Sequence, residues 1–362
     1  MSGSRLVYWS WDSFFASLGS LRLQDNEIVK KNLDFYLRLQ RADGAIPKRV
    51  AHPLYWMKFI GVPIRETKDR QRPTFFNSYF TAESIAQNPI LIIAFEEYIR
   101  ATNDLKFLDE HYNKLHGIFT YLKSREKKAG LLHEGMGGGW AESVLKRGAI
   151  SFTNMCYARS LWAMAELAKT HGAFEDEKHY GEEFKRLKTT INHQLWSDSE
   201  GGYYSDWLGH LRHHHFATDG NLLAIWWDLA SPAQAVLIQK KIDSLSLEDD
   251  VPIKLAYDSY SFWRIYIFNR IGGVKDYHVG FSWTWLGCVD VLVKLKMGKP
   301  ELATVILEKI ATKIVEDGTV HETYNNGKVV STLFYKGEHP WAWGAGMFLY
   351  ACSEAGYHLA AN

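Results

Sequence analysis

One carboxylate in the chain has neighbours that would suit a proton donor. Glu142 ends the segment 137–142, Gly-Gly-Gly-Trp-Ala-Glu. The glycines allow the backbone to approach a bound molecule closely, because glycine adopts left-handed and crowded conformations without steric cost. An indole packed against a carboxyl group disfavours its charged form, so Glu142 would keep its proton near neutral pH and act as a general acid. The same residues also fit a glycine turn with a solvated glutamate. Other parts of the sequence are needed to choose between these two interpretations.

The composition suits a protein that binds sugars. Of its 362 residues, 14 are Trp and 19 are Tyr, and aromatic residues make up 14% of the chain. Aromatic rings stack on the C–H faces of a pyranose, although an unusually aromatic core would give the same composition. The 42 basic and 41 acidic residues give a net charge of +1. That balance leaves no electrostatic footprint for a nucleic acid or an anionic membrane surface.

The sequence predicts a soluble, cytoplasmic protein. It has no secretory signal and no run of about 20 apolar residues that could span a bilayer. Its three cysteines, Cys156, Cys288 and Cys352, lie in apolar helical stretches and are expected to be buried free thiols. No cofactor is expected, and the oligomeric state is left open.

Helix pairs recur along the chain at a spacing that predicts a barrel. Helices are expected at 12–22, 26–41, 79–101, 105–125, 151–171, 177–195, 219–230, 232–244, 281–297, 299–316 and 341–356, with a short hairpin at 196–206 and a further short helix within 252–270. The first helices of successive pairs begin about 60–70 residues apart. Six such hairpins would close into an (α/α)6 barrel, a single catalytic domain over residues 1–362, although only five outer helices are evident. An open solenoid is the alternative, but its repeats are usually about half as long.

In this barrel the segments that precede the inner helices meet at one end, here called the crater. These segments carry side chains that suit a sugar: Tyr8, Trp11, Asp12, Gln87, Trp140, Glu142, Arg147, Asp219, Tyr277, His278, Trp283, Glu322, Glu338 and Trp341. Structural roles are also possible, since Asp12 and Asp219 would serve as helix N-caps and Trp283 would plug the barrel. The run His213–His215 lacks the spacing of a zinc site, so no metal site is predicted.

Several of these segments together resemble the clan of six-hairpin glycoside hydrolases. The opening segments, Trp-Asp-Ser-Phe-Phe at 11–15 and Leu-Gln-Arg-Ala-Asp-Gly-Ala-Ile-Pro at 39–47, are similar to those of family 63 enzymes, as is Gln-Asn-Pro at 87–89. The segment Trp-Ala-Glu at 140–142, followed by Arg147, Gly148 and Asn154, resembles the acid-bearing segment of glucoamylase-like and amylo-1,6-glucosidase proteins. Those relatives more often have Asp where this chain has Glu142, and many carry an N-terminal β-domain that this sequence does not include.

The later segments extend the resemblance over nearly the whole chain. Tyr-His-Val-Gly-Phe-Ser-Trp at 277–283 matches an element of debranching enzymes and neutral invertases, and the segments 321–327 and 341–343 resemble the part that holds their catalytic base. The resemblance implies an exo-acting hydrolase of a small α-glucoside or similar α-glycoside that inverts the anomeric configuration. It implies Glu142 as the acid and Glu322 as the base, with Glu338 as the rival base.

The remaining residues receive supporting roles under this interpretation. Asp12 would grip sugar hydroxyls, and Trp11, Trp140, Trp283 and Trp341 would form the walls of the site. Arg147 would contact the substrate or restrain Glu142, while Arg49 and Arg65 would bind an anionic aglycone such as glycerate. Other functions stay open: a sugar 2-epimerase or isomerase that uses His210, His213–His215, His278, His321 and His339, a glycoside phosphorylase, or a sugar-binding barrel without catalysis.

Overall fold

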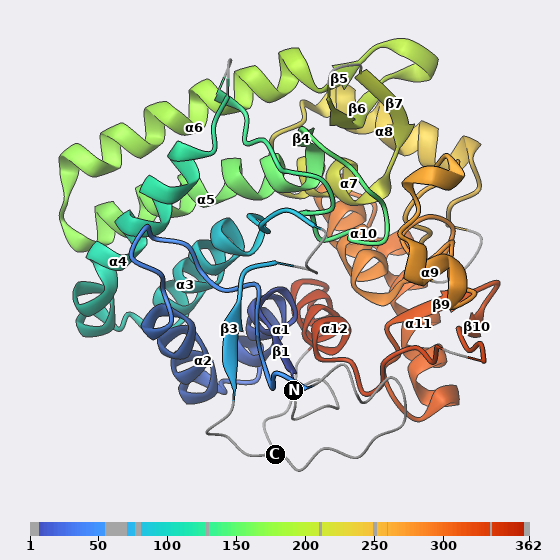
Figure 1. Ribbon diagram of the computed structural model, residues 1–362, viewed down its shortest axis with the longest axis horizontal. Helices are drawn as coiled ribbons and strands as arrows, with labels where there is room; N and C mark the ends of the chain where they lie inside the picture. Colours follow the sequence, from blue (N-terminus) through green and yellow to red (C-terminus); the bar gives the residue numbers. More distant parts are fainter. Residues whose placement is uncertain are drawn as a thin grey trace.

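Six helices form a closed ring, which confirms the predicted (α/α)6 barrel (Figure 1). The computed structural model describes residues 7–54, 71–76, 81–127, 130–209, 212–248, 252–258, 260–333 and 335–357. The inner helices are α1 (Ser10–Arg22), α3 (Gln87–Thr102), α5 (Ser151–His171), α7 (Thr218–Trp226), α10 (Thr284–Lys296) and α12 (Ala342–Glu354). Each packs against the next in this order, and α12 packs back against α1.

Five outer helices surround this ring in the described part of the chain. They are α2 (Asn26–Arg38), α4 (Leu105–Ser124), α6 (Phe174–Gln194), α8 (Pro232–Ser244) and α11 (Pro300–Asp317), and a short α9 (Ile267–Ile271) falls in the region where a further helix was expected. Their sequences are amphipathic: α2 buries Val29, Leu33, Tyr36 and Leu37 on one face. The inner helix α3, by contrast, is buried on all sides from Gln87 to Ile99. The hydrophobic pattern therefore separates the two layers.

Two glycines close the ring at the junction between its first and last helices. A Cβ atom added to Gly19 would lie 2.1 Å from the carbonyl oxygen of Gly346, and one added to Gly346 would lie 2.4 Å from the Cα of Ala16. Helices α1 and α12 can therefore touch backbone to backbone only because these positions have no side chain.

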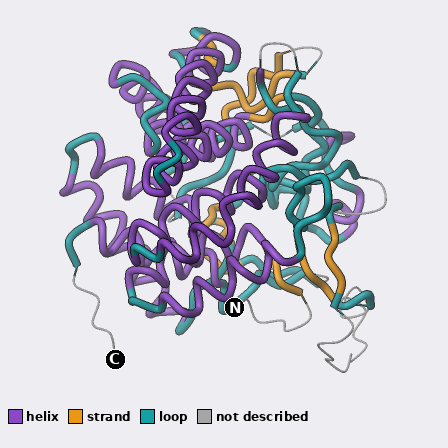
Figure 2. Tube along the Cα trace, turned by 90° about the vertical axis from the view of Figure 1, so that its left-hand side faces the viewer, coloured by secondary structure: helices purple, strands orange, loops and turns teal. Residues whose placement is uncertain are grey.

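Short strands gather with the long connecting loops toward one side of the helical body (Figure 2). They are β1 (Val7–Trp9), β2 (Arg49–Ala51), β3 (Arg72–Thr74), β4 (Ala149–Ile150), β5 (Trp196–Ser197), β6 (Tyr203–Leu208), β7 (Arg212–Phe216), β8 (Ser282–Trp283), β9 (Thr323–Asn325) and β10 (Lys328–Val329). They form three antiparallel sheets with the orders β1-β2-β3, β10-β9-β8 and β4-β6-β5, and β7 pairs with β6. Strands β1, β4, β7 and β8 lead directly into inner helices, so these sheets fix the segments at the crater.

Two expectations about secondary structure need correction. Helix α3 begins at Gln87 rather than at residue 79, and the described residues 81–86 are not helical. Pro89 lies in its first turn, where the missing N–H costs no hydrogen bond. The predicted hairpin is present as β5 and β6, but β6 continues into a ribbon with β7 that the sequence did not predict. None of the described helices is long and apolar enough to cross a membrane.

Candidate active site

Acidic side chains from four crater segments influence one another electrostatically. Asp12 lies in the first turn of α1, and its carboxyl Oδ1 accepts a hydrogen bond of 2.8 Å from the indole Nε1 of Trp341, just before α12. Burial, together with the nearby carboxylates of Glu338 and Glu142, raises the pKa of Asp12 to about 7. Asp12 is therefore within electrostatic reach of Glu338 and Glu142.

The raised pKa of Asp12 predicts that the stability of the protein depends on pH. The folded state holds the Asp12 proton up to pH about 7, whereas an unfolded chain releases it near pH 4. The free energy of unfolding must therefore fall between these pH values. Asp12→Asn removes the ionisation and keeps an acceptor for Trp341. We expect its thermal midpoint to exceed that of the wild type by a few degrees at pH 8 but not at pH 4. Calorimetry at both pH values checks this, and an equal difference at both would contradict it.

Glu322 is held at the start of α10 by backbone hydrogen bonds. Its carbonyl oxygen accepts from the Thr284 backbone N–H at 3.3 Å, and its own N–H donates to the carbonyl oxygen of Glu338 at 3.1 Å. Strand β9, which follows it, pairs with β8 so that Trp283 lies opposite Thr323. The small sheet thus joins the segment of Glu322 to the segment of Trp283.

The Glu322 side chain is buried, with only 8% of the residue exposed. The hydroxyl of Tyr335 donates a hydrogen bond of 2.8 Å to its Oε2, and the hydroxyl of Tyr277 is a second partner. Burial raises the pKa of Glu322 to about 8, the Glu338 charge adds to this rise, and the two hydroxyls oppose it. Sequence reasoning did not predict the role of Tyr335, because no pattern marks one tyrosine in that loop.

Glu142 has a different environment from the predicted one. Its Oε2 lies 2.5 Å from the ammonium Nζ of Lys48, and about a third of its side chain is exposed. The indole of Trp140 is only 3% exposed and donates from Nε1 to Oδ2 of Asp219 at 2.7 Å. The partner that the structure gives to the Glu142 carboxylate is therefore a buried cation rather than a neighbouring indole. Lys48 was missed because it is 94 residues away in the chain.

The residue after Glu142 is fixed by His278. The Ser143 backbone N–H donates to Nδ1 of His278 at 3.3 Å, and the Ser143 Oγ lies 2.8 Å from the same nitrogen. The ring of His278 stacks on Trp283 with centroids 5.0 Å apart. Burial lowers the pKa of His278 well below its usual value, so the ring is neutral. His278 therefore positions the segment of Glu142.

The four predicted wall residues belong to the buried hydrophobic core. Trp11, Trp140, Trp283 and Trp341 are at most 4% exposed. Trp140 meets Trp283 edge to face at 5.3 Å, and Trp283 meets Trp341 at 5.9 Å. A sugar would reach only the rims of these rings, so stacking on them stays a prediction. Trp9, which stacks on Trp11 at 6.4 Å, is half-buried and therefore more accessible.

The glycine run has a structural reason. A Cβ atom on Gly138 would lie 2.9 Å from the carbonyl oxygen of Glu83, and one on Gly139 would lie 3.1 Å from Oε2 of Glu134. Glu134 is buried, accepts a hydrogen bond from Thr153, and has its pKa raised to about 7 by burial. The close approach that the sequence suggested is thus made to the protein itself.

Gln87 and Asp219, which were predicted to bind the substrate, are buried and make hydrogen bonds within the protein. The Gln87 amide donates to the carbonyl oxygens of Ile46 and Ser84. Asp219 is 1% exposed, anchors Trp140 and has its pKa raised to about 6 by burial. It lies inside α7 and is not its N-cap, which is Ala217.

Tyr8 and Arg147 are less buried than Gln87 and Asp219. The Tyr8 ring contacts Phe35 on α2 edge to face at 6.4 Å. Arg147 is exposed, and a substrate contact from it stays a prediction. Arg49 is 7% exposed and lies 4.9 Å over the ring of Trp9, whereas Arg65 and His210 lie outside the described residues.

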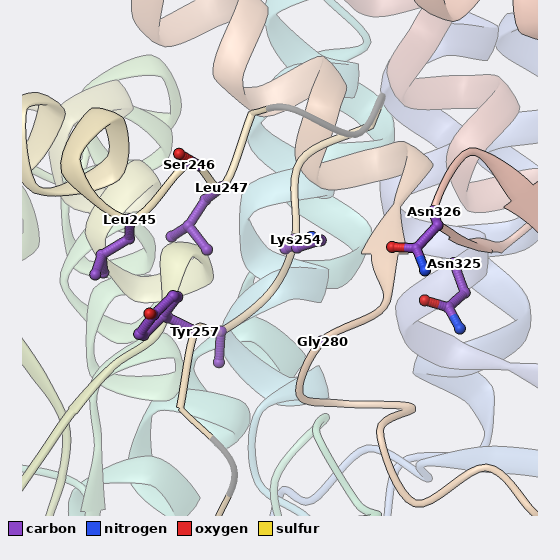
Figure 3. A pocket seen from close by; sticks show the side chains of 9 residues that line it. Leu245, Ser246, Leu247, Lys254, Tyr257, Gly280, Asn325 and Asn326 are labelled. Carbon is purple, nitrogen blue, oxygen red and sulfur yellow. The ribbon is translucent and has the colours of Figure 1, made fainter.

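A cavity of about 360 Å³ is lined by none of these carboxylates (Figure 3). Figure 3 shows Leu245, Ser246, Leu247 and Tyr257 on one side and Asn325 and Asn326 on the other, with Lys254 between them. The described residues that line it include no carboxylate. It therefore has no group that could act as the acid or base of a hydrolysis.

Solved structures share this fold. A rhamnosidase from Klebsiella oxytoca with rhamnose bound aligns with a TM-score of 0.68 and 12% identity, over 95% of this chain and 57% of that one. The family 63 mannosylglycerate hydrolase of Thermus thermophilus in complex with glucose aligns with a TM-score of 0.68 and 14% identity, over 97% of this chain and 93% of that one. At these identities the likeness shows the fold alone.

Two glycoside hydrolase family models match successive parts of the sequence, in agreement with the six-hairpin fold of the solved structures. More specifically, the model described as "Mannosylglycerate hydrolase MGH1-like glycoside hydrolase domain" matches residues 6–144. That match includes Asp12, Lys48 and Glu142. A trehalase model matches residues 154–254.

A curated relative is similar over part of the chain. Neutral/alkaline invertase 1, mitochondrial, from Oryza sativa subsp. japonica is 33% identical over 132 residues, which is 34% of this chain. The match spans 20% of that relative's length.

Proposed function

We propose that this protein is an inverting, exo-acting glycoside hydrolase of a small α-glycoside, with Glu142 as the general acid and Glu322 as the general base. The observation that carries the proposal is the contrast between these carboxylates at the crater. Glu142 is about one-third exposed and bound to a cation, whereas Glu322 is buried with tyrosine hydroxyls. The resemblance of the segments 140–142 and 321–327 assigns the two roles that glycoside hydrolysis requires, and the exposed part of the Glu142 side chain suits contact with a glycosidic oxygen.

The proposed step moves two protons and exchanges one bond. Glu142 gives its proton to the glycosidic oxygen, and the C–O bond breaks with its electron pair on that oxygen. A water on the opposite face of the sugar forms the new bond to the anomeric carbon and gives a proton to Glu322. Inverting enzymes hold the two carboxyls roughly 6.5–9.5 Å apart to admit that water. Asp12, fixed by Trp341, would accept hydrogen bonds from sugar hydroxyls.

The names of the relatives support one substrate class. The matching family models are named for mannosylglycerate hydrolase and trehalase, and the curated relative is an invertase. We therefore favour a small α-glucoside or α-mannoside cleaved at its non-reducing end. Arg49, buried beside Trp9, would suit an anionic aglycone near this end of the barrel.

Proton NMR of the anomeric signal tests the function. The wild type and Glu142→Gln are incubated with α-glucosides, α-mannosides, mannosylglycerate, trehalose and sucrose. We expect the wild type to release the β-anomer first from one α-substrate and the folded Glu142→Gln variant to lose this release. Release of the α-anomer first would contradict inversion, and an uncleaved but rearranged sugar would indicate the epimerase instead.

Two further outcomes overturn the proposal. Cleavage that requires inorganic phosphate would indicate a phosphorylase. Binding of a sugar to both proteins without any reaction would indicate a sugar-binding barrel. Circular dichroism of each variant serves as the control for folding.

A further inference from the structure

The feature behind this inference is a buried lysine at the proposed acid. The side chain of Lys48 is fully buried, and its Nζ lies 2.5 Å from Oε2 of Glu142. The Glu142 side chain is 35% exposed. One carboxylate oxygen thus contacts a buried cation, while about a third of the side chain is exposed.

The position of Lys48 is fixed by the start of α1. The backbone N–H and the Oγ of Ser10 both donate to the Lys48 carbonyl oxygen, at 3.0 and 2.5 Å. The ammonium lies 4.7 Å from the ring centroid of Trp11 and 5.0 Å from that of Trp9. These aromatic faces replace part of the water that a buried ammonium loses. Lys48 is therefore held rigidly beside the helix turn that carries Asp12.

The charged groups around Lys48 affect its pKa in opposite directions. Burial lowers the pKa of Lys48 to about 8, and Glu142 opposes this fall. Arg49, the next residue in the chain, lowers it further, and Glu134, from the segment before the glycine run, raises it. Glu142 and Glu134 are thus the acidic groups that favour the charged form of Lys48, and Glu142 is the one in direct contact with its ammonium. Removing either partner of a buried pair leaves the other charge unpaired.

We propose that Lys48 is the positioning residue of the acid: it holds Oε2 of Glu142 so that the other oxygen faces the leaving group, and it stabilises the carboxylate left after proton transfer. The inference rests on the proposed hydrolase function. In the step, the O–H bond of Glu142 breaks, its proton moves to the glycosidic oxygen, and the new negative charge on Glu142 meets the ammonium. Lys48 itself gains and loses no proton.

Steady-state kinetics of Lys48→Met and Lys48→Arg, measured across pH on the substrate that the NMR panel identifies, test this role. We expect Lys48→Met to lower kcat by at least about 10-fold, since orientation of a catalytic group contributes on this scale. KM should change by less than about 3-fold, because the buried Lys48 side chain presents no exposed surface to a sugar. The alkaline limb of the profile should move to higher pH, since the variant lacks the cation that faces the proposed acid. Lys48→Arg keeps the charge, so it should keep the wild-type limb, with kcat below the wild type because its larger planar head displaces the carboxylate.

Lys294→Met is the matched control. Lys294 is an equally buried lysine, 3% exposed, that pairs with Glu248 at 2.5 Å and with Asp290 in the later part of α10. The same substitution there should lower stability while leaving the pH profile unchanged. A shift in both variants would indicate a general loss of packing and contradict the proposal.

Other outcomes separate this inference from the proposed function. If the wild type inverts an α-glycoside and Lys48→Met keeps its kcat and profile, the function stands and the inference fails. If Lys48→Met instead moves the acidic limb of the pH profile, Glu142 acts as the base, which contradicts both the proposed roles and the inference about Lys48. A wild type that cleaves nothing contradicts the function. Should Lys48→Met fail to fold, wild-type kcat in a folded Lys48→Arg variant would contradict positioning by this ammonium.

Discussion

Glu322→Gln is expected to lower kcat by about 10²–10⁴-fold at every pH, whereas Glu338→Gln keeps hydrolytic activity. The reason is the position of the two side chains. Glu322 is buried and held by the hydroxyls of Tyr335 and Tyr277. Glu338 acts on it through its charge, and the two are joined by a backbone hydrogen bond.

The raised pKa of Glu322 predicts how activity should change with pH. The pKa of Glu322 is raised to about 8, and a general base must be ionised to accept a proton. We therefore expect kcat/KM, which reports the free enzyme, to rise with pH through about 8 in the wild type. Glu338→Gln removes a charge that raises this pKa, so the acidic limb should move to lower pH.

Stopped or continuous assays of both variants between pH 5 and 10 decide between the candidates for the base. Loss of activity in Glu338→Gln with activity kept in Glu322→Gln would assign the base to Glu338. A wild-type kcat/KM that falls as pH rises through about 8 would mean that Glu322 works as the acid. Either result would refute the assignment made here.

Lys146→Met is expected to lower the free energy of unfolding by about 3–5 kcal/mol. Lys146 is paired with Asp206 at 2.6 Å, and their side chains are 4% and 1% exposed. Asp206 also accepts a hydrogen bond of 2.5 Å from the hydroxyl of Tyr260. Without the ammonium, this carboxylate stays buried and unpaired with a cation, which is the costly part of breaking such a pair.

Urea unfolding measures the loss, and Arg22→Met is its control. Arg22 pairs with Glu354 at 2.7 Å, with side chains 24% and 41% exposed, so its removal should cost no more than about 1 kcal/mol. The double variant Lys146→Met/Asp206→Asn should recover part of the loss, because it removes the unpaired charge. Equal losses from Lys146→Met and Arg22→Met would show that burial does not govern this pair.

The loss should also reach the site, because Lys146 belongs to the same segment as Glu142. Its carbonyl oxygen accepts a hydrogen bond from the Gly137 backbone N–H at 3.0 Å, which closes the loop around the proposed acid. We therefore expect Lys146→Met to reduce activity at temperatures where it is still folded.

The sequence by itself determined the barrel and the segments at its crater. Helix periodicity and the recurrence of about 60–70 residues are local properties, so they could be read before any contact was known. The segments of Asp12, Glu142, Glu322 and Trp341 were located in this way. The aromatic residues among them were also recognised, but whether each faces a ligand or the core was not.

Only the tertiary structure decided which side chains act together. Lys48 and Glu142 are 94 residues apart, and Asp12 and Trp341 are 329 residues apart. Asp12 meets Trp341 where the ring of helices closes, with Gly19 against Gly346 at the junction, and Lys48 meets Glu142 only once the loops before α3 and α5 have packed together. Contacts between residues far apart in the chain leave no periodic pattern in the sequence. Burial, too, depends on the folded barrel rather than on any one segment, and burial is what raises or lowers the pKa values described here.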